Sequence, residues 1–304
     1  VTLGFEEFRG TPEDEVPGAE QLAQRYGTDH QTIWVTQRDF AEARDDLLAA
    51  MDQPTIDGVN SYFVSRAARE AGLKVALSGV GGDELFGGYP SFREIPHLVR
   101  TVGRIPGVST LGAGIRIVSA PLVKHLTSPK YAGVLEYGND MAGAYLLRRG
   151  LFMPWELPDL LDPDLVREGW KALQPLLHLR QTTRDLQDDH LCVTALESAW
   201  YMRNQLLRDT DWASMAHSLE VRTPLVDWDL LNNAAPLIKQ HGLTKDDMAR
   251  TPNVGLPEAL LKRPKSGFTI PVREWLLAGR PDLKDVRGYR GWAQYIYRSF
   301  TKEL

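Results

Sequence analysis

The sequence predicts an α/β fold, with a parallel sheet in residues 1–95 and a mostly helical part in residues 96–304. Up to residue 95, short apolar segments alternate with amphipathic segments of helical period, which is typical of parallel strands joined by helical crossovers. Beyond Pro96 the strand signals fade and longer helical patterns follow. A glycine-rich turn comes directly after the third predicted strand, where open parallel sheets bind their ligands.

The first predicted strand covers residues 1–5 and is followed by an amphipathic helix. Ala19, Leu22, Ala23 and Tyr26 recur at i, i+3, i+4 and i+7, which places them on one helix face. The glycine after Tyr26 is a typical helix end.

The next two strands are predicted over residues 32–35 and 74–78. Between them, Thr36 and Asp39 have the spacing of a capping box ahead of a second helix. A third helix is predicted over residues 59–71, where the apolar residues again follow the helical period.

Long helical patterns dominate the rest of the chain, notably over residues 188–202 and 205–219. The most apolar window, residues 105–123, contains an arginine, three glycines and two prolines. It therefore predicts a buried or lid-like helical segment rather than a membrane span.

The composition narrows the class of protein. The net charge of −5 gives no basic surplus, which disfavours a nucleic-acid binder. Cys192 is the single cysteine, so no internal disulfide or cysteine-based metal cluster can form, and this suits a reducing, cytoplasmic compartment. The seven histidines show no ligand spacing. We expect small-molecule partners, with no nucleic acid and no membrane.

The strongest local signal is the turn at residues 78–89, Ser-Gly-Val-Gly-Gly-Asp-Glu-Leu-Phe-Gly-Gly-Tyr. Glycines let backbone N–H groups approach an anion closely, and Asp83 and Glu84 could hold Mg²⁺ beside phosphates. On the glycines alone, the alternative is a simple turn with an acidic helix start. The turn is neither a Walker A loop nor a dinucleotide-binding fingerprint.

Two further segments could carry chemistry. Residues 263–268, Arg-Pro-Lys-Ser-Gly-Phe, place Lys265 in a loop before a helix predicted at residues 272–277. Its amine could neutralise a phosphate in a transition state, or it could be an ordinary solvated lysine. The second segment, residues 207–224, could carry chemistry, or it could be a core helix that ends in a structural ion pair between Glu220 and Arg222.

Taken together and in this order, the three segments resemble the synthetase domain of glutamine-dependent asparagine synthetases. The family pattern Leu-Ser-Gly-Glu-Gly-x-Asp-Glu-x-Phe-Gly-Gly-Tyr is matched at residues 77–89. The patterns Ser-Met-Ala-His-x-x-Glu-x-Arg-x-Pro and Arg-Pro-Lys-x-Gly-Phe are matched from residue 214 and at residues 263–268. The resemblance covers essentially the whole chain.

The resemblance implies a fold and a reaction. The fold is the adenine nucleotide α-hydrolase (PP-loop ATPase) type of sheet, followed by a helical subdomain. In the reaction, ATP and Mg²⁺ serve to adenylate a carboxylate, normally the aspartate side chain, with release of pyrophosphate. Ammonia then attacks the acyl-adenylate to give asparagine and AMP.

The resemblance also implies site roles at the matching positions. Lys265 is the lysine that stabilises charge at the α-phosphate, and Asp83 is the carboxylate on Mg²⁺ and pyrophosphate. Glu84 is a further metal residue or lies behind the metal ligands. At Leu3 the strand backbone meets the adenine. The nucleotide-binding positions are Leu3, Ser78, Gly79, Gly81 and Gly82.

Two departures from the family pattern leave alternatives open. The pyrophosphate loop and the glutaminase domain are absent, so we interpret the chain as a fragment, inactive alone, of a possible homodimer that takes ammonia from glutamine. Val80 stands where asparagine synthetases carry Glu and β-lactam synthetases carry Tyr, and valine moves no proton. A different carboxylate acceptor, a ring closure, or a non-catalytic scaffold are therefore the alternatives.

Overall fold

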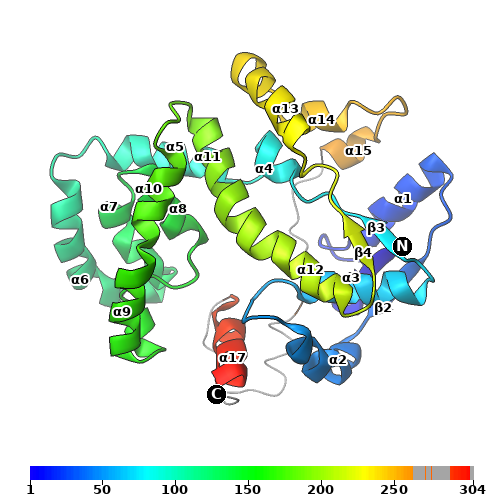
Figure 1. The fold of residues 1–304 in the computed structure, drawn as a ribbon, viewed down its shortest axis with the longest axis horizontal. Helices are drawn as coiled ribbons and strands as arrows, with labels where there is room; N and C mark the ends of the chain where they lie inside the picture. The colour runs from blue at the N-terminus through cyan, green and yellow to red at the C-terminus, as the bar shows by residue number, and fades with distance from the viewer. Residues whose placement is uncertain (263–270, 272–274, 276–287, 302–304) are drawn as a thin grey trace. The chain divides into compact units, whose positions relative to one another are not determined.

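The computed structural model describes residues 1–262, 271, 275 and 288–301 (Figure 1). The chain forms two compact units, neither of which is continuous in sequence. The first, which we call the α/β unit, comprises Val1–Val80, Arg203–Asp227 and Lys245–Leu304. The second, the helical unit, comprises Gly81–Met202 and Trp228–Thr244. The division that the sequence predicts, at residue 95, stays a prediction.

The described strands of the α/β unit pair in parallel, as predicted. Strand β1 (Thr2–Phe5) pairs with β2 (Thr32–Val35), and β3 (Val75–Leu77) pairs with β4 (Glu220–Arg222). Helix α1 (Val16–Tyr26) connects the first pair and ends, as predicted, at a left-handed glycine. Among the described residues the strands form two small sheets rather than the single sheet that the sequence predicts.

The helix predicted over residues 205–219 ends four residues earlier than predicted. Helix α12 ends at Met215, and Ser218 takes a left-handed conformation with φ of 53°. The chain then turns into β4, where the Ser78 N–H donates to the Arg222 carbonyl at 2.8 Å. Glu220 and Arg222 therefore belong to a strand that pairs with β3, and not to a helix end.

Local capping explains where α2 (Gln37–Ala50) begins. The Thr36 hydroxyl accepts the Asp39 N–H, and the Asp39 carboxylate accepts the Thr36 N–H, so the predicted capping box is confirmed. The third predicted helix is α3, where the described bounds are Val59–Glu70. The other described helices of this unit are η1 (Glu6–Phe8), α12 (Arg208–Met215), α14 (Lys245–Ala249), α15 (Glu258–Leu261) and α17 (Arg290–Thr301).

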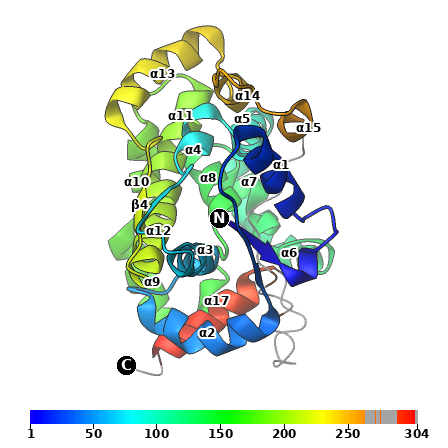
Figure 2. The ribbon, with the colours of Figure 1, turned by 90° about the vertical axis from the view of Figure 1, so that its right-hand side faces the viewer.

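The core of the α/β unit is built from aromatic and aliphatic side chains of β1, α2, α3, α12 and α17. Leu47 and Phe63 are almost fully buried, at 0% and 2% exposure. Phe40 lies with its ring centroid 6.2 Å from that of Trp292, so α17 packs against α2 (Figure 2). This core includes residues of α3 and α12, the two helices that line the candidate site together with β3.

The helical unit has a separate core around Ile95, Tyr145 and Leu196. Helix α11 (Asp189–Leu196) continues as η4, a π-helix over Glu197–Leu207, so the helical patterns predicted over residues 188–202 and 205–219 join without a gap. The other helices are α4 (Gly82–Phe86), α5 (Ser91–Val102), α6 (Val108–Leu126), η2 (Pro129–Gly133), α7 (Val134–Tyr137), α8 (Met141–Arg149), η3 (Leu157–Asp159), α9 (Pro163–Leu173), α10 (Pro175–Thr183) and α13 (Trp228–His241).

The apolar window at residues 105–123 forms most of α6, so the predicted helix is confirmed. The helix is not buried along its length, because Ile117, Val118 and Leu122 are each more than 60% exposed. No helix in the described part of the chain combines the length and the apolar character that crossing a membrane requires.

Candidate functional site

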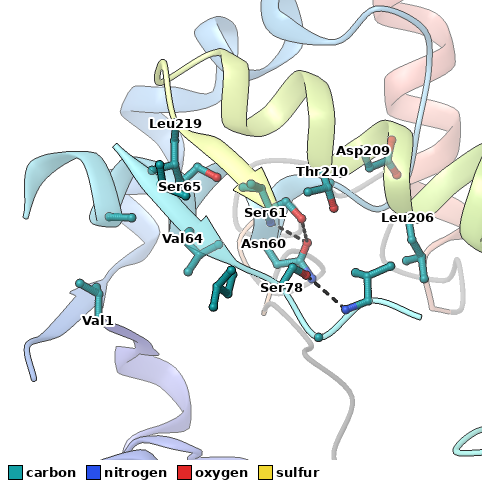
Figure 3. A pocket seen from close by; sticks show the side chains of 18 of the residues that line it. Val1, Asn60, Ser61, Val64, Ser65, Ser78, Leu206, Asp209, Thr210 and Leu219 are labelled. Carbon is teal, nitrogen blue, oxygen red and sulfur yellow. Dashed lines mark hydrogen bonds between the residues drawn. The ribbon is translucent and has the colours of Figure 1, made fainter. Parts of the chain in front are cut away.

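A pocket of about 630 Å³ lies in the α/β unit, at β3 and the loop that follows it (Figure 3). Helix α3 contributes Asn60, Ser61 and Val64, and the start of α12 contributes Asp209 and Thr210. The strand side is mostly apolar, whereas the end beyond the strand is lined by hydroxyl, amide and carboxylate groups. Because ligands bind beyond the carboxyl ends of parallel strands, this polar end is the candidate ligand site.

Ser78 and Gly79, two predicted nucleotide positions, both line this pocket. Pairing with β4 fixes Ser78, since its N–H donates to the Arg222 carbonyl at 2.8 Å. Its hydroxyl accepts the Val80 N–H at 3.3 Å, which Figure 3 marks with a dashed line. Val80 also lines the pocket, so an apolar side chain stands where the family pattern places a carboxylate.

Leu3 does not line the same pocket. Its side chain is 6% exposed in the core of the α/β unit, and it lies opposite Ile33 in the β1–β2 pair. Val1, two residues earlier on the same chain segment, does line the pocket. The predicted role of the Leu3 backbone at an adenine stays a prediction.

Gly81 and Gly82 begin the helical unit and are buried. Gly81 has φ of 100°, a conformation that side chains other than glycine rarely tolerate. Its N–H donates to the Glu84 carboxylate at 3.1 Å, which closes the first turn of α4. The glycine at position 81 is therefore required by the backbone itself.

Asp83 is partly exposed and lies against Gly88. A Cβ atom on Gly88 would come within 1.9 Å of the Asp83 Oδ1, so only glycine leaves room for this carboxylate. Magnesium beside phosphates needs only one or two protein carboxylates, and Asp83 offers such an oxygen ligand. The described residues contain no cluster of three or more His, Cys, Asp or Glu side chains that could hold a metal by themselves.

Glu84 has different surroundings from its neighbour, because it is only 2% exposed. Its Oε2 accepts the Gly81 N–H, and its Oε1 accepts the Tyr89 hydroxyl at 2.7 Å. Burial raises the pKa of the Glu84 carboxyl above its usual range, although the Tyr89 hydrogen bond opposes the shift. Whether Glu84 contacts a metal stays a prediction.

Asp209, for which the sequence predicts no role, lines the pocket and is 2% exposed. It accepts the Thr55 hydroxyl at 2.7 Å and the Trp212 indole N–H at 3.0 Å. Burial raises the pKa of Asp209 to about 6. Asp209, Trp212 and Ala213 stand at i, i+3 and i+4, so the helical period could have indicated that Asp209 lies on the buried helix face.

Lys265, together with the motif at residues 263–268, lies outside the described residues. Its predicted role at the α-phosphate therefore stays a prediction. The same holds for most of the helix predicted at residues 272–277.

Comparison with known proteins gives consistent matches. A family model described as asparagine synthase matches residues 1–288. The chain is 30% identical, over 296 residues, to a putative glutamine-hydrolyzing asparagine synthetase of Mycobacterium tuberculosis, covering 91% of this chain and 42% of that protein. It is 28% identical, over 294 residues, to glutamine-hydrolyzing asparagine synthetase 1 of Bacillus subtilis, covering 90% of this chain and 43% of that protein.

A third relative is a putative glutamine-hydrolyzing asparagine synthetase 2 of Methanocaldococcus jannaschii. It is 36% identical over 185 residues, which is 57% of this chain and 30% of that protein. The chain thus spans well under half the length of each of these three relatives.

Proposed function

Because this chain belongs to the asparagine synthase family, we propose that it is the ATP-binding synthetase part of an amide-forming ligase. The observation that carries the proposal is the placement of Ser78 and Gly79, which line a pocket beyond the end of a parallel strand. ATP is the proposed ligand of that pocket. The proposed products are an amide, AMP and pyrophosphate.

The proposed reaction has two steps. A carboxylate oxygen attacks the α-phosphorus of ATP and pyrophosphate leaves, so that a poor electrophile becomes a reactive mixed anhydride. The nitrogen of ammonia then attacks the acyl carbon and releases a proton, and AMP leaves with the electrons of the broken carbon–oxygen bond. When bound, Mg²⁺ would neutralise charge on the phosphates. Asp83 is the residue proposed to hold it.

Lys265 is proposed to stabilise the negative charge that develops at the α-phosphate. The support is its motif, Arg-Pro-Lys-Ser-Gly-Phe, which stands in the same order after the glycine-rich turn as in the family pattern. A lysine amine is suited to this role because it keeps its positive charge near neutral pH.

Aspartate is the proposed acceptor, because the matched relatives carry the name asparagine synthetase. Val80 favours a second candidate, in which a different carboxylate is amidated or cyclised. Valine lines the pocket without a group that could bind ammonium or take a proton from an amine. Product masses from a panel of carboxylates would distinguish the two.

The full-length protein is proposed to supply what this chain lacks, namely a pyrophosphate loop and a glutaminase domain that provides ammonia. The names of the relatives include glutamine hydrolysis, and the chain spans about two fifths of the first two. Within the α/β unit, Leu77 of β3 is 77% exposed where it lines the pocket, so this strand offers an apolar surface for a further segment. A cytoplasmic location and a homodimer stay predictions.

The test measures carboxylate-dependent pyrophosphate release by the full-length protein over a panel that includes aspartate. We expect release with at least one carboxylate, and a loss of about 10²- to 10³-fold in Lys265→Ala, as for other groups that stabilise transition-state charge. Lys262→Ala is the matched control, because Lys262 is an exposed lysine three residues earlier in the sequence that pairs with Glu258 at 3.6 Å. A folded protein without release on any carboxylate would contradict the proposal and favour a non-catalytic scaffold.

A further inference from the structure

We propose that Glu84 is a positioning residue: it fixes the Gly81 backbone, and a network of buried and partly buried side chains holds Glu84 in place. This inference rests on the proposed function, because it assigns different roles to two adjacent carboxylates of the same site. Asp83 would contact the metal, and Glu84 would hold the loop without contacting the metal. The network lies wholly in the helical unit.

The surroundings of Glu84 leave no place for a hydrated metal ion. Its side chain is 2% exposed, and each carboxylate oxygen already accepts a hydrogen bond, one from Gly81 and one from Tyr89. Magnesium loses its bound water reluctantly and usually keeps several water ligands, for which this buried carboxylate leaves no room. Asp83, by contrast, is partly exposed.

The bond to Glu84 fixes a backbone that would otherwise be free to move. Gly81 has no side chain to restrict it, and its φ of 100° is one of several conformations open to glycine. When its N–H is held at 3.1 Å by a buried carboxylate, the orientation of the Val80–Gly81 peptide is set. That peptide directly follows Ser78 and Gly79, the proposed nucleotide positions.

Tyr89 is in turn held by a cation. The Arg149 guanidinium lies 4.6 Å from the ring centroid of Tyr89 and 3.8 Å from that of Tyr201. The two rings are 6.0 Å apart and inclined at 76°, so the guanidinium contacts both. Such cation–π contacts gain strength when they are removed from water.

Arg149 is anchored by Glu197, which is fully buried at 0% exposure. Its Nε lies 2.9 Å and 3.1 Å from the two carboxylate oxygens. Glu197 also accepts the Ser91 hydroxyl at 2.5 Å and the Tyr145 hydroxyl at 3.4 Å. The network therefore runs from the start of η4 through α8 to the glycine-rich loop.

Substitutions at position 84 separate positioning from metal binding. In Glu84→Gln the amide oxygen can still accept the Gly81 N–H, whereas Glu84→Ala removes both hydrogen bonds. In the full-length enzyme we expect Glu84→Ala to lower kcat/KM for MgATP by at least about tenfold more than Glu84→Gln, the effect of losing hydrogen bonds to a charged group. The Mg²⁺ concentration for half-maximal rate should be the same in Glu84→Gln and the unmodified enzyme.

Tyr89→Phe tests the next link, because it removes the hydroxyl and keeps the ring beside Arg149. We expect kcat/KM to fall about tenfold. Tyr137→Phe is the matched control, since Tyr137 is a partly buried tyrosine of the same unit that lies outside the network. It should change kcat/KM less than about twofold at equal thermal stability.

The inference is overturned if Glu84→Gln is as inactive as Glu84→Ala and needs much more Mg²⁺, because Glu84 would then bind the metal directly. It is also overturned if Tyr89→Phe behaves like Tyr137→Phe. Hydrogen exchange at the Gly81 amide provides a readout independent of activity. Faster exchange in Tyr89→Phe than in Tyr137→Phe supports the network even if the unmodified protein releases no pyrophosphate, and equal exchange contradicts it.

Discussion

The two units each bury a carboxylate, and they stabilise it in different ways. In the α/β unit, Asp209 accepts hydrogen bonds from the neutral groups of Thr55 and Trp212, and burial raises its pKa to about 6. In the helical unit, Glu197 is fully buried and pairs with Arg149 at 2.9 Å. Both side chains lie out of water, but only Glu197 is held by a short ion pair.

The difference indicates how each unit should respond to perturbation. The Arg208 guanidinium lies 3.6 Å from Asp209 and does not offset the burial of this carboxyl, which lowers that penalty by taking up a proton, so the α/β unit should be sensitive to pH. A carboxylate in a buried ion pair depends on its partner, so the helical unit should be sensitive to loss of that partner. Three substitutions, taken in order of expected effect, test this comparison.

The largest effect is expected for Arg149→Met. The substitution keeps an apolar stem of similar length but leaves the fully buried Glu197 without its cation. Breaking a buried ion pair in this way costs about 3–5 kcal/mol of unfolding free energy, measured by urea denaturation at neutral pH. The double variant Arg149→Met/Glu197→Gln should recover much of the loss. A loss below about 1 kcal/mol in the single variant would break the comparison.

A smaller effect, dependent on pH, is expected for Asp209→Asn. The pKa of Asp209 is about 6 in the folded state and about 3.9 in an unfolded chain. The carboxyl therefore contributes stability that is fully present below about pH 4 and is lost as pH rises through about 6. The nearby charges are Asp57, which raises this pKa, and Arg208, which lowers it.

The asparagine variant carries no such dependence. Relative to the unmodified protein, the unfolding free energy of this variant should increase by about 2 kcal/mol as pH rises from 4.5 to 7.5. Asp45→Asn, at a side chain that is 83% exposed, matches the change in net charge. A difference that is flat over this pH range would show that Asp209 does not titrate there.

The smallest effect is expected for Thr36→Ala. This substitution removes a hydroxyl that is hydrogen-bonded to a third carboxylate, the partly buried Asp39. Burial raises the pKa of Asp39, but the hydroxyl and N–H of Thr36, with the charges of Arg66 and Arg38, lower it by more, so the net pKa lies below its usual value. Removing the hydroxyl should cost about 1 kcal/mol, the usual value of a helix cap. Thr36→Ser keeps a hydroxyl and should retain most of this stability. A loss equal to that of Arg149→Met would break the proposed order of effects.

Local elements of the fold were predictable, because they depend on residues that are close in sequence. The glycine that ends α1 and the capping box of Thr36 with Asp39 are set by neighbours within four positions. Strand β4 was not predictable in this way. Its three residues become a strand only by pairing with β3, more than 140 residues earlier in the chain.

The sequence by itself determined the family, the parallel pairing of the strands, and the position of Ser78 and Gly79 after β3, since each is carried by an ordered motif or a local period. The tertiary structure alone decided that Leu3 lies outside the pocket and that Asp83 and Glu84, adjacent in sequence, have opposite surroundings. Burial is the physical reason. How much water reaches a carboxylate depends on residues distant in the chain, such as Tyr89 and Arg149, which no local pattern reveals.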